Sequence, residues 1–330
     1  MNDFRDSSVL VTGGTGSFGT EFISHLLESG APARIVVFSR DELKQYELRQ
    51  RLLPDDQDRI RFFLGDIRDL SRLTMAMKGI DYVVHAAALK QVDTAEYNPM
   101  EFVKTNVLGS ENVIQAAIAN RVKKVVALST DKASSPVNLY GATKLTADKL
   151  FISSNHYVEA GGTRFAVVRY GNVMASRGSV IPLFKELASR SEPLPITDTR
   201  MTRFWITLPQ AVQFVIDSFA DMNGGELYVP RIPSMKVTDL AEAIAPGSDL
   251  VEIGIRPGEK LHEEMIASAD APRTLERSDR YVVAPTMAVW GGYEAPEGTP
   301  VAGDFSYSSD KNDQWLSIDD LRKMLADLDK

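Results

Sequence analysis

The chain has 330 residues, 44% of them hydrophobic, so it can bury a substantial core in one large domain or two unequal lobes. Its 45 acidic and 37 basic side chains give a net charge of −8, which argues against a binder of nucleic acid, whose surface would be basic. There is no cysteine, which excludes disulfides and thiolate metal sites, and the four histidines show no metal-ligand spacing. With no run of about 18 apolar residues and no signal-peptide start, we expect a cytoplasmic protein without membrane or metal sites.

Six short runs rich in β-branched residues alternate with longer helical patterns in the first half of the chain. This alternation predicts an α/β fold, a Rossmann-like, doubly wound parallel sheet covered by helices on both faces. The predicted strands are Ser8–Thr12, Arg34–Phe38, Ile60–Gly65, Asp81–Ala87, Lys124–Thr130 and Arg164–Tyr170.

Between these runs, FGTEFISHLLESG has apolar residues at helical spacing and ends on Gly30, a plausible C-cap. Later helices are expected near Pro99–Asn120 and Asn138–Ala160. Beyond Tyr170 the rhythm changes to segments broken by proline and glycine. We therefore predict a cofactor-binding domain with the catalytic residues over 1–170. A smaller, mainly substrate-binding lobe is expected over 171–330, with some segments returning to the first domain.

A glycine-rich stretch, TGGTGSFG, follows the first predicted strand and opens the first predicted helix. Without side chains the turn can be tight, and its backbone N–H groups can approach a pyrophosphate at the helix N-terminus. The pattern alone is weak evidence, but the strand and helix that it requires are present, so an incidental glycine turn is the less favoured interpretation. The predicted cofactor contacts here are Gly13, Thr15, Gly16, Ser17, Phe18 and Gly19.

The end of the second predicted strand, FSRDELK, bears on the choice of cofactor. An acidic residue alone would bind the ribose 2′-hydroxyl of NAD, whereas an arginine accommodates the 2′-phosphate of NADP. Because Arg40 comes before Asp41, we expect NADP; the alternative is that Arg40 is a solvated turn residue. The predicted contacts here are Ser39, Arg40, Asp41 and Lys44.

Residues after the third and fourth predicted strands complete the expected cofactor site. Asp66 would lie beside the adenine, unless it caps the helix that starts near Asp69. The small residues of HAAALK let a cofactor lie against the backbone, and His85 is expected to be packed and not catalytic. The further predicted contacts are Ile67, Ala86, Ala87, Lys90 and Asn106.

The stretch STDKASSPVNLYGATK carries the residues expected to do chemistry. Tyr140 and Lys144 are four apart and lie on one face of a helix, so both can address one ligand. A cation near a phenol favours the phenolate, which makes Tyr140 a plausible base toward a substrate hydroxyl.

These motifs, together with HAAALKQVDTAEYNP, VRYGNVMASRGSVIP, ITDTRMTRFWIT, IRPGEKLHEEM and FSYSSDKNDQWL, resemble the inverting UDP-N-acetylglucosamine (UDP-GlcNAc) 4,6-dehydratases. These enzymes are extended short-chain dehydrogenase/reductases that open pseudaminic acid biosynthesis. The resemblance runs nearly end to end. Retaining dehydratases of the superfamily carry Asp-Glu where this chain has Asp131-Lys132.

The resemblance implies four catalytic residues. Tyr140, supported by Lys144, would deprotonate the C4 hydroxyl while NADP accepts a hydride. Lys132 would then remove the C5 proton and Asp131 would protonate the departing C6 hydroxyl. We expect burial or Lys144 to depress the pKa of Lys132, so that it can act as a base.

The resemblance also implies contacts to the UDP-sugar, and a chain of net charge −8 needs local cations for the diphosphate. Phe204 and Trp205 are expected in the core and not stacked on uracil. The predicted substrate contacts are Lys90, Thr130, Asn172, Ser176, Arg177, Ser179, Val180, Thr197, Arg203, Arg256 and Glu259.

Three alternatives remain open. A UDP-sugar 4-epimerase shares the glycine turn and the Tyr140/Lys144 pair but does not need Asp131-Lys132. A retaining dehydratase differs only in the C5 outcome, and an NADP-sensing protein without turnover would keep the fold alone. The family also suggests a homo-oligomer, from dimer to hexamer.

Overall fold

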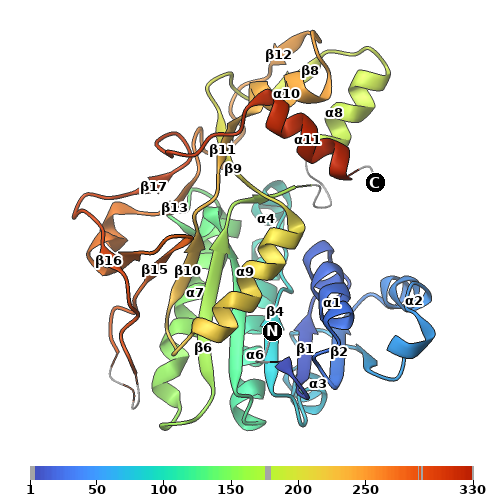
Figure 1. The fold of residues 1–330 in the computed structure, drawn as a ribbon, viewed down its shortest axis with the longest axis vertical. Coiled ribbons are helices and arrows are strands. Elements are labelled where there is room, and N and C mark those ends of the chain that lie inside the picture. Colours follow the sequence, from blue (N-terminus) through green and yellow to red (C-terminus); the bar gives the residue numbers. More distant parts are fainter. Residues whose placement is uncertain (1–3, 175–179, 289, 291–292, 329–330) are drawn as a thin grey trace.

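The computed structural model describes residues 4–174, 180–288, 290 and 293–328. The main sheet consists of β1 (Ser8–Thr12), β2 (Arg34–Ser39), β3 (Ile60–Leu64), β4 (Tyr82–His85), β5 (Lys124–Thr130), β6 (Arg164–Tyr170), β10 (Leu227–Pro230), β14 (Thr274–Glu276), β15 (Arg280–Val283) and β16 (Thr299–Pro300). Its order is β16-β14-β15-β10-β6-β5-β4-β1-β2-β3 (Figure 1). Strands β1 to β6 and β10 are parallel, and β15, β14 and β16 join β10 through antiparallel pairings.

All six strands predicted from the sequence are present, and the α/β class with a parallel-dominated sheet is confirmed. Their ends differ from the prediction by no more than two residues. The largest difference is at β4, which ends at His85 and not at Ala87. The chain leaves the sheet there because it passes close to the glycine turn, whose Gly13 lies against the Ala87 backbone.

Helices cover both faces of this sheet (Figure 1). On one face α1 (Ser17–Ser29) packs beside α9 (Leu208–Asp221), and on the other α6 (Gly109–Ala119) lies between α3 (Leu70–Ala76) and α7 (Leu139–Ser153). The predicted C-cap of α1 is confirmed, since Gly30 has a φ of 64° and its N–H donates to the Leu27 carbonyl.

The two later predicted helices are present but divided. The first comprises α5 (Pro99–Phe102), a π-helical segment (Val103–Leu108) and α6. The second is α7, followed by a 3₁₀ turn at Ser154–Tyr157. The remaining elements of this half are α2 (Glu42–Gln50), α4 (Val92–Tyr97), a 3₁₀ turn at Pro54–Asp56 and the 3₁₀ turn η4 (Asp131–Ala133).

The second half of the chain builds the upper part of the molecule and also returns to the main sheet through β10 and β14 to β16 (Figure 1). Its small sheets have the orders β11-β9-β7, β12-β8 and β13-β17. Strand β13 packs beside the η4 turn, which brings this half against the end of β5. The elements are β7 (Asn172–Val173), α8 (Val180–Ser189), β8 (Leu194–Ile196), β9 (Thr202–Ile206), β11 (Ser234–Lys236), α10 (Val237–Ile244), β12 (Leu250–Glu252), β13 (Glu264–Ile266), a 3₁₀ turn at Ser268–Arg273, β17 (Tyr307–Ser308) and α11 (Ile318–Leu328).

The largest hydrophobic core surrounds the main sheet, and a second core joins α10 to α11. Phe204 belongs to the first and Trp205 to the second, as expected from the sequence. Within the described residues, no helix combines the length and the apolar character that a membrane span requires.

Candidate active site

The glycine turn after β1 brings the N-terminus of α1 close to the end of β4. Gly13 has a φ of 66°, and a Cβ there would lie 2.8 Å from the Ala87 backbone nitrogen. A Cβ at Gly19 would lie 2.6 Å from the Gly13 carbonyl oxygen. Gly16, the N-cap of α1, supplies no side-chain cap, so the first N–H groups of the helix are available to an anionic ligand.

A cavity of about 280 Å³ lies over this turn. Eleven residues predicted to bind the cofactor line it, and they come from the ends of β1 to β4 and the segments that follow them. Such a crevice at the carboxyl ends of parallel strands fits a dinucleotide. The eleven residues are Gly13, Thr15, Gly16, Ser39, Arg40, Asp41, Lys44, Asp66, Ile67, Ala86 and Ala87.

The charged residues that line this cavity differ in how far they are engaged by other groups of the protein. Asp41 is the N-cap of α2, where it accepts a hydrogen bond from the Lys44 backbone N–H at 3.0 Å and pairs with the Lys44 ammonium at 2.8 Å. Arg40 is exposed at the cavity wall. Asp41, which follows the end of β2, is therefore engaged within the protein, while the exposed Arg40 lines the cavity.

Asp66 also lines this cavity, and it is not a helix cap, because Asp69 caps α3 by accepting from the Arg72 N–H. The alternative interpretation of Asp66 is therefore wrong. Burial tends to raise the pKa of Asp66, but hydrogen bonds from Arg68 outweigh burial and leave the pKa below its usual value.

Asn106 and His85 support the site from within the protein. The Asn106 amide donates to the Leu89 carbonyl at 2.9 Å and accepts from the Leu89 N–H at 2.9 Å, so it fixes the Leu89 backbone instead of lining either main cavity. His85 is buried between Thr12 and Ser110, and burial lowers its pKa to about 3, which confirms that it is packed.

A second cavity of about 370 Å³ adjoins the first and shares Gly13, Gly16 and Ala86 with it. It contains all four predicted catalytic residues, two from the η4 turn and two from α7. The predicted residues in its wall are Ser17, Phe18, Gly19, Lys90, Thr130, Asp131, Lys132, Tyr140, Lys144 and Asn172.

The charge state expected for Tyr140 is not what the structure shows. Burial raises the pKa of Tyr140 to about 12, although the Lys132 ammonium acts in the opposite direction. Lys144 does not supply the expected effect, because its ammonium donates to the Leu128 carbonyl at 2.7 Å. Burial lowers the pKa of Lys144, which the Asp148 carboxylate partly offsets.

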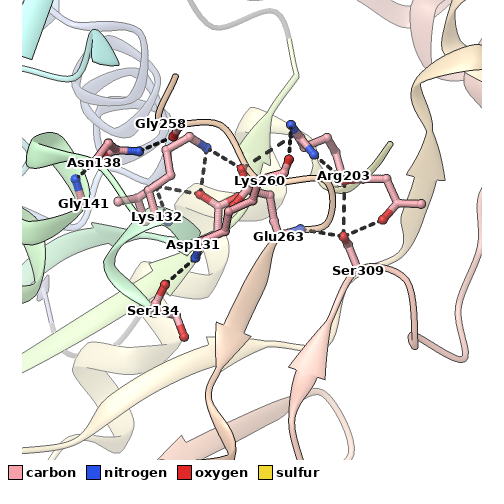
Figure 2. A network of polar contacts seen from close by, with 12 residues as sticks. Asp131, Lys132, Ser134, Asn138, Gly141, Arg203, Gly258, Lys260, Glu263 and Ser309 are labelled. Carbon is pink, nitrogen blue, oxygen red and sulfur yellow. Dashed lines mark hydrogen bonds and ion pairs between the residues drawn. The ribbon is translucent and has the colours of Figure 1, made fainter. Parts of the chain in front are cut away.

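The expected depression of the Lys132 pKa is also wrong. Burial tends to lower this pKa, but the carboxylates of Asp131 and Glu263 outweigh burial and raise it above its usual value. The Lys132 ammonium lies 3.1 Å from Asp131 Oδ1 and 3.2 Å from Glu263 Oε1 (Figure 2). Lys132 is therefore held as an ammonium between two carboxylates.

Glu263 is a residue of this site that the sequence analysis missed. It lies in IRPGEKLHEEM, far along the chain from Lys132, and no local spacing connects the two positions.

Gly141 permits the approach of α7 to the η4 turn, since a Cβ there would overlap the Lys132 carbonyl oxygen. Gly141, directly after the predicted catalytic Tyr140, is the local sequence signal that α7 packs closely against the η4 turn.

The contacts predicted for the UDP-sugar are only partly brought together. Asn172, Arg203 and Glu259 line a third cavity of about 130 Å³, next to Lys132 and Glu263. Arg203 is buried, and its guanidinium donates to three carbonyls, those of Thr202, Lys260 and Leu261.

Three further predicted sugar contacts among the described residues, Val180, Thr197 and Arg256, do not line these three cavities. Val180 begins α8, Thr197 directly follows β8 and Arg256 is exposed. Ser176, Arg177 and Ser179 lie outside the described residues.

Several buried acceptors around these cavities have no hydrogen-bond partner in the described part of the protein. They are Asp131 Oδ2, Asn172 Oδ1, Glu259 Oε2 and Glu263 Oε2. Buried polar atoms are normally hydrogen-bonded, so a concentration of free acceptors indicates a polar ligand rich in donors. Among the described residues no group of three or more His, Cys, Asp or Glu could hold a metal ion.

Comparison with known proteins agrees with this geometry. The family model described as "Polysaccharide biosynthesis protein" matches residues 9–285. The chain belongs to this family. A relative from Campylobacter jejuni subsp. jejuni, named UDP-N-acetylglucosamine 4,6-dehydratase (inverting), is 51% identical over 326 residues, covering 96% of this chain and 97% of the relative. A relative from Rickettsia rickettsii, named UDP-glucose 4-epimerase, is 42% identical over 285 residues, covering 84% and 83%.

Solved structures place this member of the family among the extended short-chain dehydrogenase/reductases. The X-ray structure of Pen from Bacillus thuringiensis has a TM-score of 0.88 at 38% identity and covers 99% of this chain and 100% of that one. DesIV, a dTDP-glucose 4,6-dehydratase from Streptomyces venezuelae with NAD bound, has a TM-score of 0.68 at 25% identity and covers 77% and 86%. This family member is therefore an enzyme of the dehydratase type.

Proposed function

We propose that this protein is an NADP-dependent, inverting UDP-GlcNAc 4,6-dehydratase that makes UDP-2-acetamido-2,6-dideoxy-β-L-arabino-hex-4-ulose, the first intermediate of pseudaminic acid. The observation that carries the proposal is the contact of Asp131 with Lys132 in the cavity that also holds Tyr140 and Lys144. A hydride-transfer pair and an acid/base pair share one cavity, as elimination next to a new ketone requires. The C. jejuni relative, similar over nearly its full length, supports the substrate.

The first half of the reaction belongs to Tyr140. The chemistry that the cofactor supplies when bound is reversible hydride acceptance, together with the positive charge of its oxidised ring. Tyr140 lies in the wall that joins the glycine turn to η4, where its phenol oxygen can take the proton of the C4 hydroxyl. Lys144, which lies one helical turn after Tyr140 and donates to the Leu128 carbonyl, would hold the cofactor ribose.

The second half belongs to Asp131 and Lys132. A C4 ketone acidifies the C5 proton, so elimination needs a base at C5 and an acid at the C6 hydroxyl. Moving one proton from the Lys132 ammonium to the Asp131 carboxylate, across 3.1 Å, turns Lys132 into that base and Asp131 into that acid. The pair therefore needs no external proton to reach its working form. Reduction at C6 by the bound cofactor and delivery of a solvent proton to the opposite face of C5 would complete the cycle.

NADP is proposed because Asp41 is engaged as a helix cap while Arg40 faces the cavity. Arg40→Ala should weaken NADP about 10- to 150-fold more than NAD, since a charge-assisted hydrogen bond contributes about 1.5–3 kcal/mol. Dissociation constants of both dinucleotides, measured by titration calorimetry, test this. Arg49→Ala is the matched control, because Arg49 lies on α2, the helix that follows Arg40, but outside the cofactor cavity. Equal weakening of both dinucleotides by Arg40→Ala would contradict the assignment.

The direct test of the reaction type is turnover of UDP-GlcNAc followed by mass spectrometry. A dehydratase product has lost one water, whereas a 4-epimerase product has the mass of the substrate. The relative from Rickettsia rickettsii, named UDP-glucose 4-epimerase, makes a 4-epimerase the alternative to be tested. In an epimerase reaction, however, Asp131 and Lys132 would have no proton to move. Binding of NADP with no change in UDP-GlcNAc would instead support a sensing protein.

A further inference from the structure

The ammonium of Lys132 is held from two directions (Figure 2). Asp131, on the same η4 turn, and Glu263, just before β13, contact it at 3.1 and 3.2 Å. Both carboxylate side chains are almost fully buried, at 2% and 3% exposure, while Lys132 keeps 25% exposure on its cavity side. Lys132 lines both the second and the third cavity, so its exposed part faces space that a ligand can occupy.

Glu263 is itself fixed by several contacts. Its backbone N–H donates to Ser309 Oγ at 2.9 Å, and its carbonyl accepts from the Ser309 N–H at 2.8 Å. Arg203 Nε lies 3.8 Å from Glu263 Oε1, and the same guanidinium holds the carbonyls of Lys260 and Leu261 (Figure 2). These contacts fix the Glu263 backbone, and the buried carboxylate has the Lys132 ammonium and the Arg203 guanidinium as its charged neighbours.

Of the two residues that follow, Glu264 clamps the end of the η4 turn and Met265 binds β6, and neither forms an ion pair with Lys132. Glu264 Oε1 accepts hydrogen bonds from the hydroxyls of Ser134 and Ser135 at 2.9 and 2.7 Å. The Met265 carbonyl accepts from Arg169 at 2.8 Å. Support of the turn and contact with Lys132 are therefore divided between neighbouring residues, which makes the two roles separable by mutation.

We propose that Glu263 is a positioning residue for the elimination step, which holds the Lys132 ammonium at its place in the cavity and sets the pH range in which Lys132 works. This inference rests on the proposed function. Glu263 lies behind Lys132 and acts through it, so the hydride step at Tyr140 does not depend on Glu263.

The sign of the pH effect follows from the charges that face Lys132. The carboxylates of Asp131 and Glu263 favour the ammonium, whereas the cations oppose it. Removing the Glu263 charge therefore lowers the pKa of Lys132, and the lysine becomes a free base at lower pH. The groups to be considered are Asp131 on η4, Glu263 before β13, Arg203 on β9, Lys260 in the preceding loop and Tyr140 on α7.

The test compares Glu263→Gln with the wild type in single-turnover reactions with UDP-GlcNAc over a range of pH, following reduced nicotinamide and the 4-keto product separately. We expect Glu263→Gln to slow product formation on the order of 10- to 100-fold, because a misplaced base loses its alignment with C5. The half-maximal pH of that step should fall by about one unit or more. Formation of reduced nicotinamide should keep its wild-type rate.

Two variants separate positioning from structural support. Glu263→Asp keeps the charge and should restore a pH profile close to that of the wild type, with an intermediate rate. Glu264→Gln loosens the same turn without facing Lys132 and should leave the pH profile where it is. A Glu263→Gln enzyme whose profile does not move, whatever its rate, would overturn the inference. A wild-type enzyme that does not dehydrate UDP-GlcNAc would defeat the proposed function, and that result is independent of the Glu263 variants.

Discussion

In the Tyr140→Phe variant we expect no reduced nicotinamide when the enzyme is mixed with UDP-GlcNAc, and product formation should fall by a factor on the order of 10² to 10⁴. The phenol oxygen is the group in the cavity wall placed to take the C4 proton, and Lys144 is occupied by the Leu128 carbonyl. Without proton removal the C4 hydride cannot leave. Stopped-flow absorbance of the reduced cofactor measures this step directly.

The control for this variant is Tyr157→Phe, which changes an exposed tyrosine just beyond α7 and should leave both signals unchanged. NADP affinity should also stay within a few-fold of the wild type, because phenylalanine keeps the ring. Reduced nicotinamide that appears at the wild-type rate in Tyr140→Phe would show that another group removes the C4 proton.

Lys132→Ala should stop the reaction one step later. The C4 ketone and reduced nicotinamide should form and then accumulate, because nothing removes the C5 proton, and product should fall on the order of 10² to 10⁴-fold. A rapid-mixing experiment that follows cofactor absorbance, with quenched samples analysed for product, separates the two stages.

Because Lys132→Ala leaves the buried carboxylates of Asp131 and Glu263 without their cation, the fold must be checked by thermal unfolding. Lys132→Met keeps the side-chain volume and should show the same accumulation. Lys149→Ala, an exposed lysine on α7, is the control and should turn over normally. Normal turnover by either Lys132 variant would assign C5 deprotonation to another residue.

The features that the sequence predicts well are those that depend on residues close to one another in the chain. The glycine turn, the end of β2 and the Asp131-to-Lys144 stretch each place their side chains through one local element, so spacing alone locates them. Glu263 could not be found in this way, because its contact with Lys132 depends on how β13 packs against η4.

The sequence also did not reveal the direction in which neighbouring charges shift the pKa of Lys132. The sequence predicts that burial or Lys144 lowers the pKa of Lys132, but the carboxylates of the adjacent Asp131 and the distant Glu263 raise it. Arg203 was expected at a phosphate, yet its guanidinium is occupied by backbone carbonyls of the loop before β13. The spacing of residues in a sequence does not reveal which backbone carbonyls of the folded protein need a hydrogen bond from a side chain.

The central claim, an inverting dehydratase, is tested most directly by running the reaction in deuterium oxide and reading the first product by proton NMR. The account predicts deuterium at C5 and ring couplings of the L-arabino configuration, as expected from the similarity to the inverting relative. Early time points are needed, because a proton beside a ketone exchanges slowly on its own. A first product with the D-xylo configuration would contradict inversion, and protium retained at C5 would contradict proton removal by a base that exchanges with solvent.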